Sequence, residues 1–314
     1  MVANIQPTTT TQQQPQDEWV FLSGRPPMGE YLGFVKNNAA DGASVSFQTL
    51  SDEWRAANKR IVELERSEAG AADGPVIDPV PDDLRDLAEN IQNAALFKRT
   101  FQIVPVTIGM IELDQLVVWQ KHINTTYATE LKALLGVTPN EREVFELCLP
   151  ANPRQPPLRR MQVAPNSFVF VSPSNDLRFL EVFDFDASRI DGYDPQGPAS
   201  GVVGIVVGFG SNYLNAVHVS NRLILNNGSH RAYALRDLGI KRVPCIIQTV
   251  TLPEELQVVS PQVATNTALY LGHPRPSMLK DYFDPELRKL VPVFRKGRQV
   301  RIDFGFDVMD VPGI

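Results

Sequence analysis

The feature that most constrains the fold is the block RLILNNGSHRAYALRDLGIKRVPCII, residues 222–247. A run of apolar, β-branched residues leads into Asn-Asn-Gly, helix-forming residues follow at once, and a second glycine precedes another apolar run. This order predicts a strand, a glycine turn, a helix over 229–238 that ends at Gly239, and a last strand over 242–250. Just upstream, Ser220-Asn221 separates two short apolar runs and predicts a two-residue hairpin turn.

The junction at Gly228 has the chemistry of an anion site. The first amides of a helix have no partner within the helix, and the helix dipole adds partial positive charge there. A glycine lets a phosphate approach the backbone closely. Ser229 can bond a phosphate oxygen, while His230 and Arg231 can add charged donors. A purely structural role is equally open from these residues alone, with Ser229 capping the helix, His230 packing on the sheet and Arg231 in solvent.

The order strand, Gly-x-His-Arg-x-x-Ala, Leu-Gly turn and strand with proline resembles the ParB/sulfiredoxin superfamily. The matching residues are Gly228, His230, Arg231, Ala234, Leu238, Gly239 and Pro244. In that superfamily the turn holds the phosphates of a nucleotide. The resemblance therefore implies an α/β (α+β) fold, a mixed sheet with flanking helices, and a nucleotide site at Asn227, Gly228, Ser229, His230 and Arg231. The implied ligand is ATP or CTP with Mg²⁺, or another phosphorylated small molecule.

A second segment, IGMIELDQLVVWQKHINTTYATELKALL at 108–135, is similar to the entry unit of the superfamily. Members often carry a catalytic or positioning acid there, which makes Glu112 and Asp114 candidates for a general base or a metal holder. Lys121 is a candidate to contact a phosphate. The alternative without a function is that the two acids occupy exposed positions of an edge strand in which apolar and polar residues alternate.

Two departures narrow the resemblance. The cysteine of the sulfiredoxin turn is replaced by Ser229, which cannot form the thiol-based intermediates of sulfinic acid repair. A long insertion, at about 136–200, separates the entry unit from the turn, and no helix–turn–helix pattern follows Val250. Sulfinic acid repair and chromosome partitioning are therefore both disfavoured.

Charge and composition bound the remaining possibilities. The chain has 314 residues and a net charge of −6, which disfavours a protein that mainly grips the DNA backbone. Two cysteines without metal spacing, the absence of a secretory signal and the absence of a long apolar run predict a cytoplasmic protein that does not enter membranes. Cys245, in an apolar run, is predicted to be a core residue, and no metal site is predicted from the four histidines.

The composition divides the chain into segments. Residues 1–18 are predicted to be a disordered arm, 19–100 a helical extension with an amphipathic helix from Ser51, and 101–250 the ParB/sulfiredoxin-like domain with its insertion. Residues 251–314 are predicted to be an extension packed on that domain. The run GIVVGF, 204–209, is predicted to be a buried strand.

Three functions follow as hypotheses. The first is nucleotide or phosphate binding at 227–231, with NTP hydrolysis, phosphoryl transfer or nuclease activity in which Glu112, Asp114 and His230 take catalytic roles. The second is a non-catalytic interaction or assembly protein that reuses the fold and binds a protein partner through residues 1–67. The third is a DNA-binding partition-type protein.

Overall fold

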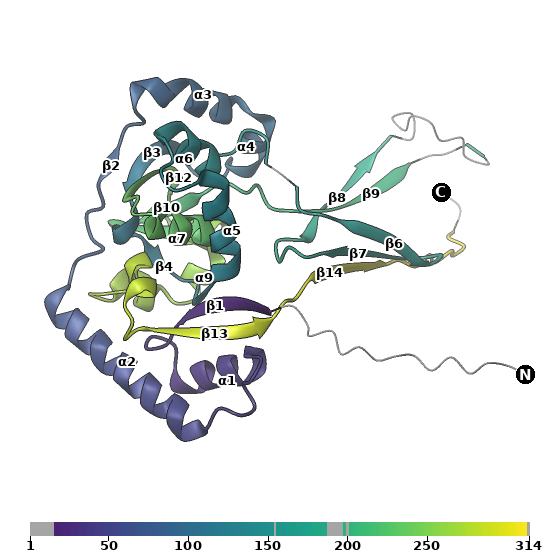
Figure 1. The fold of residues 1–314 in the computed structure, drawn as a ribbon. Helices are drawn as coiled ribbons and strands as arrows, with labels where there is room; N and C mark the ends of the chain where they lie inside the picture. The colour runs from purple at the N-terminus through teal and green to yellow at the C-terminus, as the bar shows by residue number, and fades with distance from the viewer. Residues whose placement is uncertain (1–15, 154, 187–196, 199–200, 313–314) are drawn as a thin grey trace, which may run out of the picture. The chain divides into compact units, whose positions relative to one another are not determined.

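The computed structural model describes residues 16–153, 155–186, 197–198 and 201–312. The chain divides into two compact units (Figure 1). Unit 1 comprises residues 1–151 and 213–295, and unit 2 comprises residues 152–212 and 296–314. This division differs from the expected domain limits in two ways. The inserted segment begins at residue 152 and not at about 136, and the expected C-terminal extension, 251–314, is divided between the two units.

A six-stranded mixed sheet forms the centre of unit 1, in the order β2-β3-β12-β10-β11-β4. Strand β10 runs parallel to β12, and β11 runs parallel to β4, while the other neighbours are antiparallel. The fold is therefore a mixed α/β fold of the α+β kind. The strands are β2 (Ile77–Asp78), β3 (Val106–Glu112), β4 (Val117–Val118), β10 (Asn215–Val219), β11 (Arg222–Asn227) and β12 (Arg242–Thr249).

Helices flank this sheet (Figure 1). Its apolar side chains are buried in two core clusters, a larger one that includes Leu225, Leu235 and Ile246 and a smaller one that includes Val217 and Ile224. Because β12 is apolar along almost its whole length, both of its faces need cover, and both are buried. The α-helices of the described chain are α1 (Met28–Asn38), α2 (Phe47–Ser67), α3 (Arg85–Asn93), α4 (Ala95–Thr100), α5 (Thr125–Leu135), α6 (Glu141–Cys148), α7 (Ser229–Asp237), α8 (Pro253–Val259) and α9 (Pro261–Ala264).

A second sheet in unit 1 joins distant parts of the sequence. Strand β1 (Gln16–Leu22) lies between β13 (Arg288–Phe294) and β5 (His122–Asn124), antiparallel to both. Residues 16–18 therefore belong to a strand, which corrects the expected arm over 1–18; residues 1–15 lie outside the described residues. The strand β5 leads directly into α5, so this sheet carries residues toward the start of that helix.

Unit 2 consists of β structure in two separate sheets. One has three strands in the order β14-β7-β6, with β14 at Arg298–Asp303, β7 at Ser167–Ser172 and β6 at Arg159–Ala164. The other is a ribbon of only two strands, β8 (Arg178–Phe185) and β9 (Val202–Gly208). The side chains of β8 are mostly exposed and those of β9 are half-buried or exposed. The expectation of a buried strand at 204–209 is therefore wrong: the apolar run forms a strand, but none of these residues is buried.

Several local predictions are confirmed. Ser220 and Asn221 both have positive φ (49° and 61°) between the antiparallel strands β10 and β11, as a tight two-residue hairpin turn requires. Gly239 follows α7 with positive φ, where glycine carries no steric penalty. Cys245 is fully buried in the core.

One helix start differs from the expectation. Helix α2 begins at Phe47, capped by Ser46, because the Ser46 hydroxyl accepts the Thr49 amide at 3.0 Å while Ser51 lies a turn inside the helix. Helix α5 is capped by Asn124, whose side-chain oxygen accepts the Tyr127 amide. Among the described residues, no helix has the length and apolar composition needed to span a membrane.

Candidate functional site

The predicted turn lies between β11 and α7. Gly228 is the N-cap of α7 and has a φ of +94°, in the left-handed region. A Cβ at this position would lie 3.1 Å from the backbone of Leu214, so both the left-handed conformation and the tight contact favour glycine. The exposed Asn227 accepts the Gly228 amide through its Oδ1 at 2.8 Å, and Ser229 is buried at the first helical position. The strand–Gly–helix geometry is therefore confirmed.

Arg231 has a different environment from the one expected for a phosphate ligand. Its side chain is buried, and Nη1 donates to the carbonyl oxygens of Leu147 at 3.2 Å and Cys148 at 3.0 Å, at the end of α6. The last carbonyls of a helix have no partner within it and carry the negative end of the helix dipole, so a buried guanidinium satisfies them well. In this arrangement Arg231 fastens α6 to the start of α7.

His230 lies in an aromatic cluster at the start of α7. Its ring meets Tyr127 of α5 edge-on, with centroids 5.4 Å apart, while His122 of β5 stacks on Trp19 of β1 at 4.6 Å. Burial, together with the nearby His122 and Arg231, lowers the pKa of His230 to about 4. Burial also lowers the pKa of His122. Both imidazoles are therefore neutral near pH 7, and each can accept a proton or a hydrogen bond.

The candidate acids lie at the other end of α7. Both oxygens of Asp114 pair with Arg236, in the last turn of that helix, with Oδ2 at 3.2 Å from Nη2. Glu112 is opposite Arg242 in the β3–β12 register, beside the loop that follows α7. Because eight residues of helix span about 12 Å, neither carboxylate is brought to Gly228. Asp114 instead anchors the end of α7, where Arg236 also packs over the ring of Phe283 at 4.1 Å.

Lys121 also has a partner away from the turn. It forms an ion pair with Glu30 of α1, just before β5 begins. The structure thus brings together Asn227, Gly228, Ser229 and His230, places Arg231 beneath them, and leaves Glu112, Asp114 and Lys121 elsewhere in unit 1. The phosphate and catalytic roles of these residues remain predictions.

The two cysteines lie under the turn. Burial raises the pKa of Cys148 to about 12 and raises that of Cys245 well above its usual range. Each thiol is fully buried and therefore stays protonated. The environment fits core packing and not nucleophilic chemistry.

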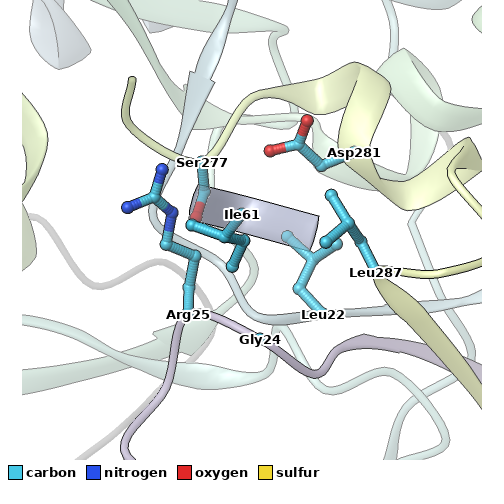
Figure 2. A pocket seen from close by; sticks show the side chains of 7 residues that line it. All are labelled: Leu22, Gly24, Arg25, Ile61, Ser277, Asp281 and Leu287. Atoms are coloured by element: carbon cyan, nitrogen blue, oxygen red, sulfur yellow. The ribbon is translucent and has the colours of Figure 1, made fainter. Parts of the chain in front are cut away.

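A separate polar cluster surrounds a small cavity in unit 1 (Figure 2). The guanidinium of Arg25 and the carboxylate of Asp281 approach it from two different segments, and apolar side chains such as Ile61 complete its wall. Asp281 pairs with the fully buried Arg275, with Nη1–Oδ2 at 2.8 Å. A volume of about 10 Å³ holds at most one water molecule, so this cluster joins chain segments and has no room for a nucleotide.

Sequence reasoning missed the aromatic residues near His230. Tyr127 meets its ring, and His122, which is close enough to lower its pKa, stacks on Trp19. The β1–β5 pairing that brings Trp19 to His122 joins residues about a hundred positions apart. No local spacing signals such a pairing. The only available clue was the polar Asn124 between a short apolar strand and a helix, which marked the start of α5 beside the site.

No group of acids, histidines and cysteines suited to a metal ion occurs among the described residues. Asp184 and Asp186, two carboxylates with the spacing of a strand face, fall in or next to β8 and form no such group. Comparison with protein-family models, with curated proteins and with solved structures found no match.

Proposed function

We propose that this chain is a phosphate-binding protein, of the ParB/sulfiredoxin-like kind that the Gly-x-His-Arg turn resembles, and that a nucleotide such as ATP or CTP is its ligand. The observation that carries the proposal is the left-handed Gly228 at the N-cap of α7, directly after a buried strand. Such a turn aims backbone amides and the positive end of the helix dipole at one point.

The proposed ligand contacts are limited to the residues that lie at this point. The amides at the start of α7 and the hydroxyl of Ser229 donate to phosphate oxygens, while the neutral His230 orients the ligand or accepts a hydrogen bond from it. Arg231 supports the turn from beneath by holding the end of α6. The proposal is for binding and not for turnover by Glu112 or Asp114, because a helix length separates these acids from Gly228.

Thermal unfolding in ATP, CTP, ADP, inorganic phosphate and Mg²⁺ tests the proposal. A ligand at 100 times its dissociation constant that binds only the folded state adds about 2.7 kcal/mol of stability. We expect Asn227→Asp to remove most of this gain, because the variant keeps the oxygen that accepts the Gly228 amide and adds negative charge beside the phosphate.

Asn140→Asp is the matched control. Asn140 caps α6 through the same kind of side-chain contact, to the Glu143 amide at 2.9 Å, but at the end of α6 that is remote from Arg231. This variant should respond to ligands as the unchanged protein does. The proposal is wrong if no phosphate compound stabilises the protein, or if Asn227→Asp and Asn140→Asp respond alike.

The second candidate is an assembly protein, and one observation favours it. The β8–β9 ribbon of unit 2 has uncovered apolar side chains on both faces, and large exposed apolar patches on a folded protein mark interaction surfaces. The expected docking helix gives no such support. Its apolar stripe, Leu50, Ala57, Ile61 and Leu64, is buried against the chain itself, so residues 47–67 do not present it to a partner.

A further inference from the structure

The β8–β9 ribbon has two free edges. Its two strands pair only with each other among the described residues, so one side of each strand presents unpaired N–H and C=O groups. An isolated two-stranded ribbon is marginally stable in water and gains stability from further strands. The structure therefore contains a sheet with room for another strand at either edge.

The faces of the ribbon are apolar as well. On β9, alternate side chains point to opposite faces, so Val203, Ile205 and Val207 share one face and Val202 and Val206 share the other. Val203 is 69% exposed and Ile205 is 41% exposed. On β8, Phe179, Leu180, Val182 and Phe183 are exposed too. A strand with apolar side chains on both faces is typical of the inside of a larger sheet structure.

The two edges differ in charge. Strand β9, with the sequence VVGIVVG, has no charged residue and no proline, whereas β8 carries Arg178, Glu181 and Asp184. Natural edge strands are usually protected by charges, proline or bulges. The β8 edge has such protection, including a register shift between Phe179 and Glu181, and the β9 edge has none. The β9 edge is therefore the one suited to pair.

The sequence of β9 fits a second β9 in the antiparallel direction. With a two-fold axis at Ile205, Ile205 lies opposite its own copy, Val203 opposite Val207, and Gly204 opposite Val206. Small residues then oppose larger ones on one face, and β-branched residues oppose each other on the other face, which stabilises cross-strand pairs. The ring of Phe183 already covers Gly204 on its own ribbon, since a Cβ there would lie 2.7 Å from that ring.

We propose that two copies of this chain associate through β9, forming a four-stranded sheet in the order β8-β9-β9-β8. The pairing is isologous and closes with two subunits. Pairing β8 with a second β8 would join two edges that carry Arg178, Glu181 and Asp184 and that a register shift interrupts, the features that protect an edge from pairing. Pairing β8 with a second β9 is heterologous, so each added copy presents the same pairing edge again and the assembly does not close. Only the β9 pair joins uncharged edges and closes.

Sedimentation of the full chain across a wide range of concentration gives the first test. The monomer has a mass of 34.9 kDa, and we expect a reversible dimer of twice that mass. Ile205→Lys should shift the protein to the monomer, because it places two like charges directly opposite each other at the two-fold axis. Val163→Lys, at an exposed apolar position of β6 in the other sheet of unit 2, is the matched control and should leave the dimer intact.

A cysteine cross-link fixes the register. Two thiols at position 205 would lie about 5 Å apart across the axis, whereas two thiols at 203 would lie about 13 Å apart along the strands. A cross-linker of shorter reach than the second distance should therefore join Ile205→Cys and not Val203→Cys. The native cysteines do not interfere because both are fully buried.

The outcomes divide cleanly. A dimer that Ile205→Lys dissociates and that cross-links at 205 supports the proposal. A protein that stays monomeric at every concentration overturns it, as does a dimer that Ile205→Lys leaves intact or that cross-links equally at 203. Ile205 is partly exposed, so these variants are expected to fold, and circular dichroism verifies it. Phosphate binding at Gly228 belongs to unit 1 and is tested by different variants, so either proposal can fail alone.

Discussion

Two regions with similar sequences have opposite environments. Strand β12 (RVPCIIQT) and strand β9 (VVGIVVG) are both short and rich in valine and isoleucine. In β12 the side chain of Ile246 is fully buried, because the strand has neighbours on both edges and the core surrounds it. In β9 the comparable Ile205 is 41% exposed on a two-stranded ribbon. A continuous apolar run thus predicts a strand that must be covered on both faces, but it does not predict which part of the chain, or which partner, covers it.

The largest expected difference is between two isoleucines. Ile246→Ala should lower the free energy of unfolding by about 2–5 kcal/mol, since it removes a fully buried side chain and leaves a cavity. Ile205→Ala should lower it by about 1 kcal/mol or less, because a large part of this side chain already meets water. Urea unfolding of both variants measures the difference. Equal losses would contradict the contrast between the two strands.

A pair of glycines sharpens the same contrast. Gly228→Ala should cost about 1–3 kcal/mol, because alanine at a φ of +94° is strained and its Cβ meets the Leu214 backbone. Gly201→Ala, immediately before β9, should change stability by no more than about 0.5 kcal/mol, since open space surrounds that position. Urea midpoints of the two variants decide it, and a tolerated alanine at 228 would contradict the left-handed turn.

Two arginines extend the comparison to polar groups. Arg231→Met should cost about 1–3 kcal/mol, because the end of α6 loses a buried donor to its carbonyls. Arg178→Met should cost at most about 1 kcal/mol, because the pair that Arg178 forms with Asp176 is exposed. Thermal unfolding of each variant measures the loss of stability. A larger loss for Arg178→Met than for Arg231→Met would contradict the assignment of Arg231 as the more important structural contact.

A pH dependence specific to unit 1 completes the comparison. The pKa of His230 is lower in the folded protein, about 4, than the value near 6.5 of an unfolded histidine. Between these values the unfolded chain binds a proton that the folded chain excludes, so stability is complete above pH 6.5 and falls as the pH drops toward 4. His122 contributes in the same direction.

Replacement of His230 isolates this contribution. In His230→Asn the loss of stability between pH 7 and pH 5 should be smaller than in the unchanged protein. Asparagine does not titrate, so the unfolded variant no longer binds an extra proton at this position. Urea unfolding at both pH values gives the two slopes. An unchanged pH dependence would show that His230 is not held neutral by its surroundings.

Sequence reasoning succeeded where neighbours along the chain decide the structure. The hairpin at Ser220-Asn221, the turn at Gly228 and the helix end at Gly239 follow from local backbone preferences, and all three are present. It failed where distant segments decide. The partners of Arg231 come from α6, and those of Asp114 and Lys121 come from α7 and α1, so charge alone did not reveal that these side chains were already engaged.

The same limit explains the errors at the chain's edges. The pairing of β1 with β13 links residues at opposite ends of the chain, so the strand character of 16–18 had no local signal. The exposure of β9 could not be predicted for a different reason. Its residues favour a buried strand, but the described part of the chain provides only one neighbouring strand for it.

The bond that Arg231 makes to the end of α6 has a further consequence. The chain leaves unit 1 soon after Cys148 and returns at Tyr213, and the Leu214 amide donates to the Cys148 carbonyl at 2.8 Å. Leu214 also lies against Gly228. The two chain segments at which the inserted segment begins and ends are therefore the same segments that contact Arg231 and Gly228. In evolutionary terms, a segment whose two ends already meet can be lengthened, exchanged or lost with little entropic penalty. The contacts at its two ends would still hold the Gly228 turn in place.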